Sequence, residues 1–337
     1  MAAARPVGMK DVARRAGVSV GTVSNVLNRP QIVSEARRER VEAAIHDLGY
    51  VRNDAARQLK LGTSRTVAVV VMDSANPFYT QLIAGMEAAA LDSGLAVIAG
   101  SSSNREDRER LYLSLFEEQR VRGILLASTG RADDVVEGIR SRGTPVVLVE
   151  RGEDAGRTPS VGVDDAAGGA IAVEHLISLG RSRIAVVASR PDLRQVAARV
   201  DGARRAARTA GAQLEVIDVE DLTVLAGREA GDRIVERDPG DRPDALFCVN
   251  DLLAVGALQA FVMGHRIAVP QDIALVGYDD IAFARSTVVP LTSVAQPADL
   301  MGRTALALLE EEVAGGMAIP RHVSFRPKLV ARESSIV

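Results

Sequence analysis

Two patterns of hydrophobic and polar positions divide this chain of 337 residues. Over residues 1–65, apolar side chains recur at helical spacing in short runs that end at glycines. Beyond residue 65, continuous apolar runs such as 67–72 and 123–128 alternate with longer amphipathic stretches. The first pattern predicts a small helical module. The second predicts parallel β-sheets covered by helices on both faces.

The helical module is predicted to contain three short helices. The first covers residues 9–16, where the apolar side chains share one face and Gly17 supplies a left-handed stop. Ser19 is the expected N-cap of the second helix, and the third runs from Ser34 to Gly49. In the second helix we expect Val20, Val23, Val26 and Leu27 to face inward, leaving Gly21, Thr22, Ser24 and Asn25 outside.

The order of helix, tight turn and helix is typical of a helix-turn-helix unit. A second helix with a small outer face can enter a DNA major groove, which is only about 12 Å wide. Hydroxyl side chains there can donate to phosphates, and Asn25 can bridge N6 and N7 of an adenine. The alternative is purely structural, because any short helical pair with a glycine turn shows similar residues.

Residues 53–61 predict a further short helix with Asn53 as its N-cap. It is well below the ~12–15 residues at which an isolated helix becomes marginal in water, so another element must stabilise it. Leu59 lies between Gln58 and Lys60 and suits a wedge that enters a minor groove and kinks the duplex. Ordinary packing in a linker is the alternative.

Beyond the linker, seven apolar runs are more than one compact sheet of typical size needs, so we expect two doubly wound lobes. Ligands of such folds bind beyond the carboxyl ends of the strands. The polar strand ends are residues 73–76, 101–104, 150–151, 164–165, 250–251 and 279–280. Helix capping is the alternative role for Asn76 and Asn250. Carboxylates that converge on one crevice repel one another unless they accept hydrogen bonds. A ligand with several hydroxyl groups supplies the hydrogen-bond donors.

The net charge of −3 conceals an asymmetry. Residues 1–65 contain 12 Lys and Arg against 6 Asp and Glu, a balance of +6, so the remainder carries −9. This division favours a polyanionic partner for the small module, although a solvated basic face is the simpler alternative. The single cysteine, Cys248, lies in an apolar run and is expected to be a buried thiol.

Several functional classes have little support. No apolar run approaches the length of a membrane span, and the first ten residues lack a signal-peptide core, so we expect a cytoplasmic protein with no membrane partner. No phosphate-binding or nucleophile motif is present, and the four histidines show no metal-ligand spacing. We therefore expect no catalytic residues, no metal and no cofactor.

The chain resembles the LacI/GalR family of bacterial transcriptional repressors. The resemblance rests on "MKDVARRAGVSVGTVSNVLN", "VSEARRERVEAAIHDLGY", "RNDAARQLKLG", "NPFYTQLIAGMEAAA", "VGVDDAAGGAIAVEHLISLG" and "VPQDIALVGYDDI". It implies an α/β fold in which a helix-turn-helix headpiece and hinge helix precede two Rossmann-like lobes of the periplasmic-binding-protein type. The implied bounds are 1–52 for the headpiece, 53–65 for the hinge helix and linker, 66–163 with 292–322 for the first lobe, and 164–291 with 323–337 for the second.

The resemblance also implies a set of DNA contacts. Val20, Gly21 and Asn25 match the base-reading positions, and Asn25 departs from the arginine that many members carry there. Leu59 matches the hinge leucine that opens the central step of a palindromic operator. The residues implied to contact double-stranded operator DNA are Ser19, Val20, Gly21, Thr22, Ser24, Asn25, Asn28, Asn53, Ala56 and Leu59.

For the lobes, the resemblance implies an effector cleft. Arg199 matches an arginine that holds ligand hydroxyl or carboxylate groups, and Asp279 matches an aspartate that accepts from sugar hydroxyls. The implied set is Phe78, Tyr79, Glu150, Arg199, Asn250, Asp279 and Gln296, with Gln195 as a weaker candidate. The expected protein is a homodimeric repressor whose effector is a sugar. A nucleobase or nucleoside effector is the alternative, and a periplasmic solute-binding protein is a more distant one.

Overall fold

The computed structural model describes residues 5, 7–51, 64–130, 133–152, 156–263, 267–315 and 319–336. The chain divides into two compact units, Met1–Thr63 and Ser64–Val337, and each is described by itself. The predicted hinge helix lies outside the described residues, and so do its candidate DNA contacts Asn53, Ala56 and Leu59. Within the described ranges, no helix has the length and apolar character needed to cross a membrane.

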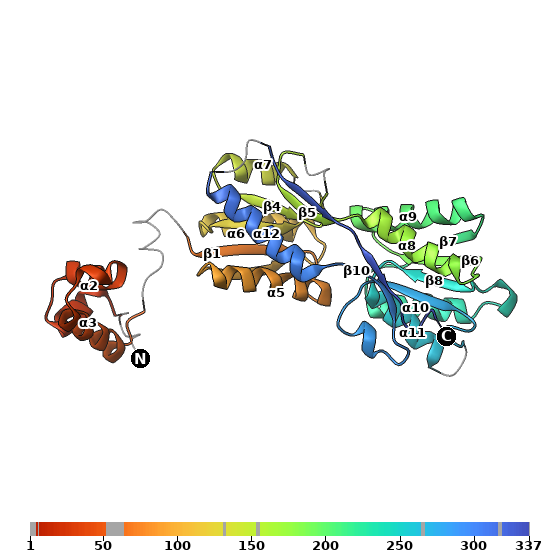
Figure 1. Ribbon diagram of the computed structural model, residues 1–337, viewed down its shortest axis with the longest axis horizontal. Helices are drawn as coiled ribbons and strands as arrows, with labels where there is room; N and C mark the ends of the chain where they lie inside the picture. Colours follow the sequence, from red (N-terminus) through yellow and green to blue (C-terminus); the bar gives the residue numbers. More distant parts are fainter. Residues whose placement is uncertain are drawn as a thin grey trace. The chain divides into compact units, whose positions relative to one another are not determined.

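The first unit is the predicted helix-turn-helix fold. It contains α1 (Met9–Ala16), α2 (Val20–Asn28), the 3-10 turn η1 (Pro30–Ile32) and α3 (Glu35–Leu48) (Figure 1). Gly17 and Gly49 end α1 and α3 at φ 65° and 60°, in the left-handed region that glycine adopts without steric cost. Val12, Val23 and Val41 are fully buried and join the three helices in one small core.

Val20 differs from its predicted position in α2. The spacing predicts it on the inward face, but it is 39 % exposed, whereas Val23 and Val26 are buried. Each step of three residues turns a helix by about 300°, so a row at this spacing drifts by about 60° per step. The drift carries Val20 toward solvent and leaves Leu27 only partly buried.

The first lobe of the second unit is built on a six-stranded parallel sheet in the order β11-β5-β4-β3-β1-β2. Helices α5 and α12 pack against each other on one face, and α6 and α7 contact each other on the other (Figure 1). The strands are β1 (Thr66–Val71), β2 (Ala96–Ser101), β3 (Gly123–Ala127), β4 (Val146–Val149), β5 (Ser160–Val163) and β11 (His322–Phe325). The helices are α5 (Pro77–Asp92), α6 (Glu106–Glu118), α7 (Asp133–Ser141) and α12 (Ala298–Val313).

The second lobe repeats this plan with the strand order β12-β10-β9-β8-β6-β7, in which only the β10–β12 pair is antiparallel among the described strands. Helices α8 and α9 form one packed pair, and α10 and α11 form another. The strands are β6 (Arg183–Ala188), β7 (Gln213–Asp218), β8 (Ala245–Cys248), β9 (Ala274–Asp279), β10 (Thr292–Ala295) and β12 (Lys328–Val330). The helices are α8 (Asp165–Ser178), α9 (Arg194–Ala210), α10 (Val224–Val235) and α11 (Asp251–Val262).

The strand pairing sets two of the lobe boundaries a few residues later than the sequence-based division. That division assigns residues 292–322 to the first lobe, but β10 pairs with β9 in the second sheet. It assigns residues 323–337 to the second lobe, but β11 pairs with β5 in the first sheet as far as Phe325. The chain therefore crosses between lobes at 296–297 and 326–327, along the blue segment of Figure 1. Strands of three or four residues carry too few positions for periodicity to identify their sheet.

Glycines bring α8 and α9 into close contact. A Cβ atom added at Gly169 would collide with the backbone carbonyl of Arg199, and one at Gly202 would collide with the backbone of Ala166. The start of α8 consequently lies against α9. This crossing places Asp165 beside Arg199.

Candidate functional site

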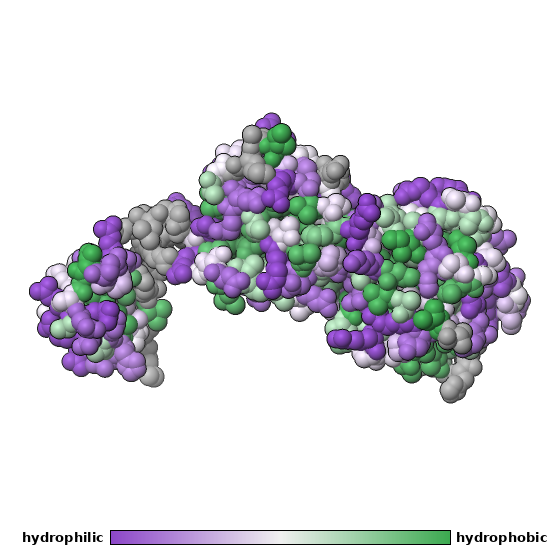
Figure 2. Space-filling model, viewed as in Figure 1, coloured by the Kyte–Doolittle hydropathy of each residue, from purple (hydrophilic) through white to green (hydrophobic). Residues whose placement is uncertain are grey.

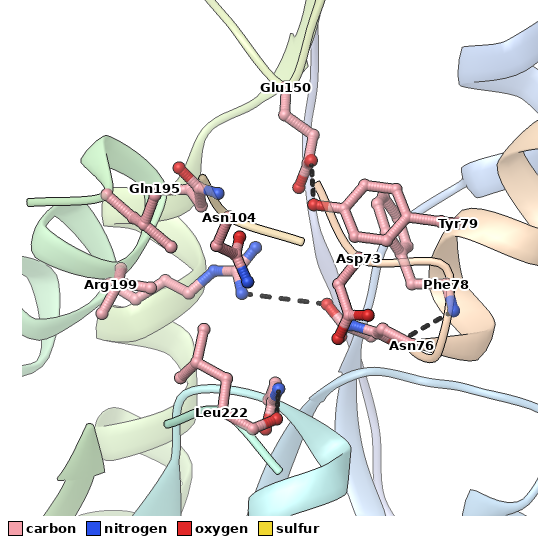
Figure 3. Close-up of a pocket in the computed structure, with 13 residues that line it drawn as sticks. Asp73, Asn76, Phe78, Tyr79, Asn104, Glu150, Gln195, Arg199 and Leu222 are labelled. Carbon is pink, nitrogen blue, oxygen red and sulfur yellow. Dashed lines mark hydrogen bonds and ion pairs between the residues drawn. The ribbon is translucent and has the colours of Figure 1, made fainter. Parts of the chain in front are cut away.

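A polar pocket in the second unit lies where the carboxyl ends of strands from both sheets meet. It holds about 430 Å³ of empty space, part of it open to solvent. Six of the seven predicted effector residues line it, and Gln296 contacts it through Asp279. The lining residues are Asp73, Asn76, Phe78, Tyr79, Asn104, Glu150, Leu193, Gln195, Val196, Arg199, Leu222, Asn250 and Asp279 (Figure 3). The structure thus brings the predicted residues together, and ligand binding by them stays a prediction.

One wall of the pocket is aromatic and comes from the start of α5. Asn76 caps this helix by accepting a hydrogen bond from the backbone N–H of Phe78 at 3.0 Å, and Pro77 takes the first helical position. The rings of Phe78 and Tyr79 pack edge to face with their centroids 5.2 Å apart. The Tyr79 hydroxyl donates to Oε2 of Glu150 at 2.6 Å (Figure 3). Both aromatic side chains are buried.

The opposite wall carries Arg199, whose guanidinium is held from several sides. Its Nε donates to Oδ1 of Asp165 at 2.8 Å, and its Nη1 donates to the carbonyl of Val249 at 2.9 Å. The guanidinium carbon lies 3.7 Å from the ring centre of Tyr278, a cation–π geometry. The Tyr278 hydroxyl donates to the same Oδ1 of Asp165 at 3.0 Å. Asp165, Arg199 and Tyr278 therefore form one buried cluster.

Asp279 connects the two walls. Its Oδ1 accepts from Nε2 of Gln296 at 2.7 Å, and its Oδ2 accepts from Nδ2 of Asn76 at 3.3 Å across the cleft. Its Oδ1 also lies 3.8 Å from Nη1 of Arg199. The backbone of Asp279 has φ 106° and that of Glu150 has φ 59°. Such backbone strain in non-glycine residues is concentrated at functional sites of proteins.

Burial changes the ionisation of the pocket carboxyls. It raises the pKa of Glu150 to about 7, against the opposing hydrogen bond from Tyr79, and raises that of Asp279 to about 6. Burial also raises the pKa of Asp165, and the adjacent Arg199 opposes this rise by stabilising the carboxylate. For Arg199, burial alone would lower the pKa, but Asp165 and the other anionic neighbours raise it above its usual range.

Both polar atoms of the Asn250 side chain form hydrogen bonds within the second lobe. Its Oδ1 caps α11 by accepting from the backbone N–H of Leu253 at 2.9 Å. Its Nδ2 donates to the carbonyl of Leu222 at 3.0 Å. The capping role is therefore present in the structure, and contact with a ligand stays a prediction.

The sequence pattern did not single out Asp165 or Asn104. Residues 164–165 and 101–104 are polar strand ends in the sequence, but nothing in the spacing shows that Asp165 turns toward α9. The signal lies in the glycines: Gly169 and Gly202 predict a close helix crossing once the two helices are known to pack. In the described parts of the chain, no group of three or more His, Cys, Asp or Glu side chains is arranged to hold a metal ion.

The second candidate site is the exposed face of α2 in the first unit. The surface of the first unit that Figure 2 shows is mostly hydrophilic. Ser19 caps α2 by accepting from the N–H of Thr22 at 3.1 Å, and Asn28 donates to the carbonyl of Ser24 at 2.9 Å. The predicted base-reading residues Val20, Gly21 and Asn25 are all exposed. Their contact with DNA stays a prediction.

Comparison with known proteins identifies relatives for both units. A family model described as "Bacterial regulatory proteins, lacI family" matches residues 8–53, and one described as "Periplasmic binding protein-like domain" matches residues 173–335. The ribose operon repressor of Escherichia coli is 34 % identical over 97 % of this chain and 99 % of its own. The transcriptional repressor PurR of Photobacterium profundum is 32 % identical over 97 % and 98 %.

A solved structure of similar overall fold is the Lac repressor dimer bound to operator and the anti-inducer ONPF. It is 26 % identical, with a TM-score of 0.86 over 99 % of this chain and 100 % of its own. The curated relatives and this structure match the chain over nearly its whole length, including both the helix-turn-helix unit and the two lobes. The chain therefore belongs to the lacI family of bacterial regulatory proteins.

Proposed function

We propose that this regulator is a transcriptional repressor that binds a pseudo-palindromic DNA operator as a homodimer and is controlled by a small molecule in the cleft. The observation that carries the proposal is the pairing, in one chain, of an exposed α2 face with a polar pocket that both lobes line. Because chromosomal DNA is the partner, the protein acts in the bacterial cytoplasm.

The shape of α2 supports DNA reading. Residues 1–65 carry a charge of +6, which suits the phosphate backbone. A Cβ added at Gly21 would meet only Oγ of Ser19, at an ordinary contact distance of 3.6 Å, so the fold of the first unit does not require glycine there. Glycine at position 21 would instead allow α2 to approach a base edge closely. Ser19, Thr22, Ser24 and Asn28 are proposed phosphate contacts, and Asn53, Ala56 and Leu59 are proposed contacts of the hinge segment.

The chemistry of the cleft supports a sugar effector. Carboxylate and amide oxygens accept from hydroxyl groups, and the ring of Tyr79 or Phe78 offers an apolar surface for the face of a pyranose or furanose. The relative named for the ribose operon agrees with this class. A nucleobase or nucleoside is the second candidate, because the same aromatic wall can pack against a planar ring.

Coupling between the sites follows from the two-lobed architecture. The hydrogen bond from Asn76 to Asp279 joins the lobes, as does one from Nη2 of Arg190 to the carbonyl of Asn104 at 3.2 Å. A ligand that competes with or adds to such bonds favours one arrangement of the lobes over another. Couplings of this kind are typically ~1–3 kcal/mol. In a homodimer, the arrangement of the lobes sets the spacing of two headpieces on two half-sites.

The proposal is tested by selecting duplexes from a random library with the full-length protein and measuring binding by mobility shift. We expect an enriched palindrome whose binding is lost on removal of residues 1–62. A thermal-shift panel of sugars and nucleosides should give one compound that stabilises both the full-length and the truncated protein and changes operator affinity. Failure to enrich any sequence, or a shift retained by the truncated protein, would contradict the proposal.

A further inference from the structure

The pocket has an excess of carboxylates over cations. Its lining contains Asp73, Glu150 and Asp279, and among the lining residues that the structure describes Arg199 alone carries a cationic side chain. Arg199 is nearly buried, with 5 % of its side chain exposed. Whether the positive charge of this single guanidinium is already balanced by a carboxylate therefore decides whether the pocket can accept a negatively charged group.

Asp165 pairs with that guanidinium from behind the pocket. It does not line the cavity, and 11 % of its side chain is exposed. Its Oδ1 takes the Nε–H of Arg199 at 2.8 Å and the hydroxyl of Tyr278 at 3.0 Å. Gly169 and Gly202 have no Cβ atoms and so let α8 and α9 cross closely, which places Asp165 against Arg199.

Helix N-termini are the other anion-attracting groups at this cleft, and two of them are already capped. The N–H of Phe78 at the start of α5 is bonded to Asn76, and the N–H of Leu253 at the start of α11 is bonded to Asn250. An incoming phosphate would have to displace these caps to use the ends of α5 and α11. It would also lie in a poorly solvated site beside Asp279, where like charges repel.

We propose that Asp165 is a specificity-determining residue: by pairing with Arg199 it makes the cleft select uncharged polyhydroxyl effectors and reject phosphorylated or carboxylated ones. The inference rests on the proposed function, because it concerns the effector of that same cleft. The Nη2 group of Arg199 can donate a hydrogen bond to a hydroxyl or carbonyl oxygen of a ligand. Its positive charge is already balanced by Asp165 and does not attract an anion. Replacement of Asp165 by a neutral residue leaves Asp279, 3.8 Å from Nη1, as the remaining carboxylate that is ion-paired with Arg199 and frees part of its charge for an anion.

The test uses the full-length protein without DNA. Wild type, Asp165→Asn and the matched control Asp164→Asn are titrated calorimetrically with D-ribose 5-phosphate and with inorganic phosphate at constant ionic strength. Asp164 is the adjacent carboxylate; it is exposed and caps α8 by accepting from the N–H of Ala167 at 2.9 Å, a bond that asparagine also forms. Asparagine at 165 keeps an acceptor for Arg199 and Tyr278.

We expect each anion to bind Asp165→Asn at least about tenfold more tightly than it binds wild type or Asp164→Asn, whose Kd is measured or bounded from below in the same titration. Asp165→Ser is the second neutral variant if the amide impairs folding, which thermal melting reports. Equal anion affinity of wild type and the neutral variants would overturn the inference, as would an equal gain in Asp164→Asn. Because no duplex is present, either result is independent of whether the protein selects an operator.

Discussion

The hydroxyl of Tyr79 donates to Oε2 of Glu150 over 2.6 Å, which joins the start of α5 to the end of β4 at the aromatic wall of the cleft. Burial raises the pKa of Glu150 from 4.5 to about 7 in spite of this bond. The folded protein therefore holds a proton on Glu150 at pH values where the unfolded chain has lost it.

A pH-dependent stability follows from that proton. The stabilising contribution of neutral Glu150 is fully present below about pH 4.5 and is lost as pH rises to about 7. Glu150→Gln cannot ionise, and its amide oxygen still accepts from Tyr79. We expect the melting temperature of the variant to exceed that of wild type by a margin that grows from pH 5 to about 7 and then levels off. Thermal melts across this range measure it.

The control for this prediction is Glu118→Gln, which replaces an exposed glutamate on α6. Its melting temperature should follow that of wild type across the range. A constant offset between Glu150→Gln and wild type at every pH would show that Glu150 does not titrate in this window.

Asn250→Ala should destabilise the second unit. The substitution removes the cap of α11, worth ~1 kcal/mol, and leaves the Leu222 carbonyl without its donor at a cost of about 1 kcal/mol more. Urea unfolding of the truncated protein lacking residues 1–62 measures the loss. Asn250→Ser retains a capping oxygen without a new charge and should lose less. If alanine leaves the unfolding midpoint unchanged, the side chain has no structural role.

Gly21→Ala separates folding from DNA binding. Alanine is favoured over glycine in a helix by ~1 kcal/mol, and space is open at this position, so the headpiece should become more stable. The added methyl blocks close approach to a base edge, so operator affinity should fall by about tenfold. Mobility shift and thermal melting of the same sample report both quantities. Unchanged affinity would place Gly21 outside the interface.

Leu59→Ala addresses the hinge segment. A leucine that wedges into a base step contributes only where the duplex is kinked, so specific binding should weaken far more than binding to random DNA. Competition titrations with operator and random duplexes at one salt concentration measure the ratio. Equal losses on the two duplexes would argue that Leu59 does not act as a wedge.

Much of the fold could be predicted from local signals. Gly17 and Gly49 end helices because only glycine adopts the left-handed region at low cost, and Ser19 caps α2 because its oxygen reaches an unpaired N–H. Polar residues that follow buried strands meet in one pocket because parallel strands end at the same edge of a sheet. Each of these rules acts within a few residues or within one sheet.

The remaining features depend on contacts between distant segments. The position of Val20 depends on the phase of a short helix relative to its neighbours, and the sheet that β10 joins depends on pairing rather than on its own four residues. The position of Asp165 depends on how closely α8 approaches α9. Side-chain spacing along the chain contains none of this information.

The first lobe is assembled from two parts of the chain, and this affects the order of folding during synthesis. Its sheet is completed by β11 (His322–Phe325), and α12 (Ala298–Val313) covers one face of it. A ribosome must therefore translate almost the entire message before the first lobe can close its core, whereas the headpiece has all its helices at the outset. Such long-range closure slows folding and leaves apolar strands of the nascent polypeptide exposed in the meantime.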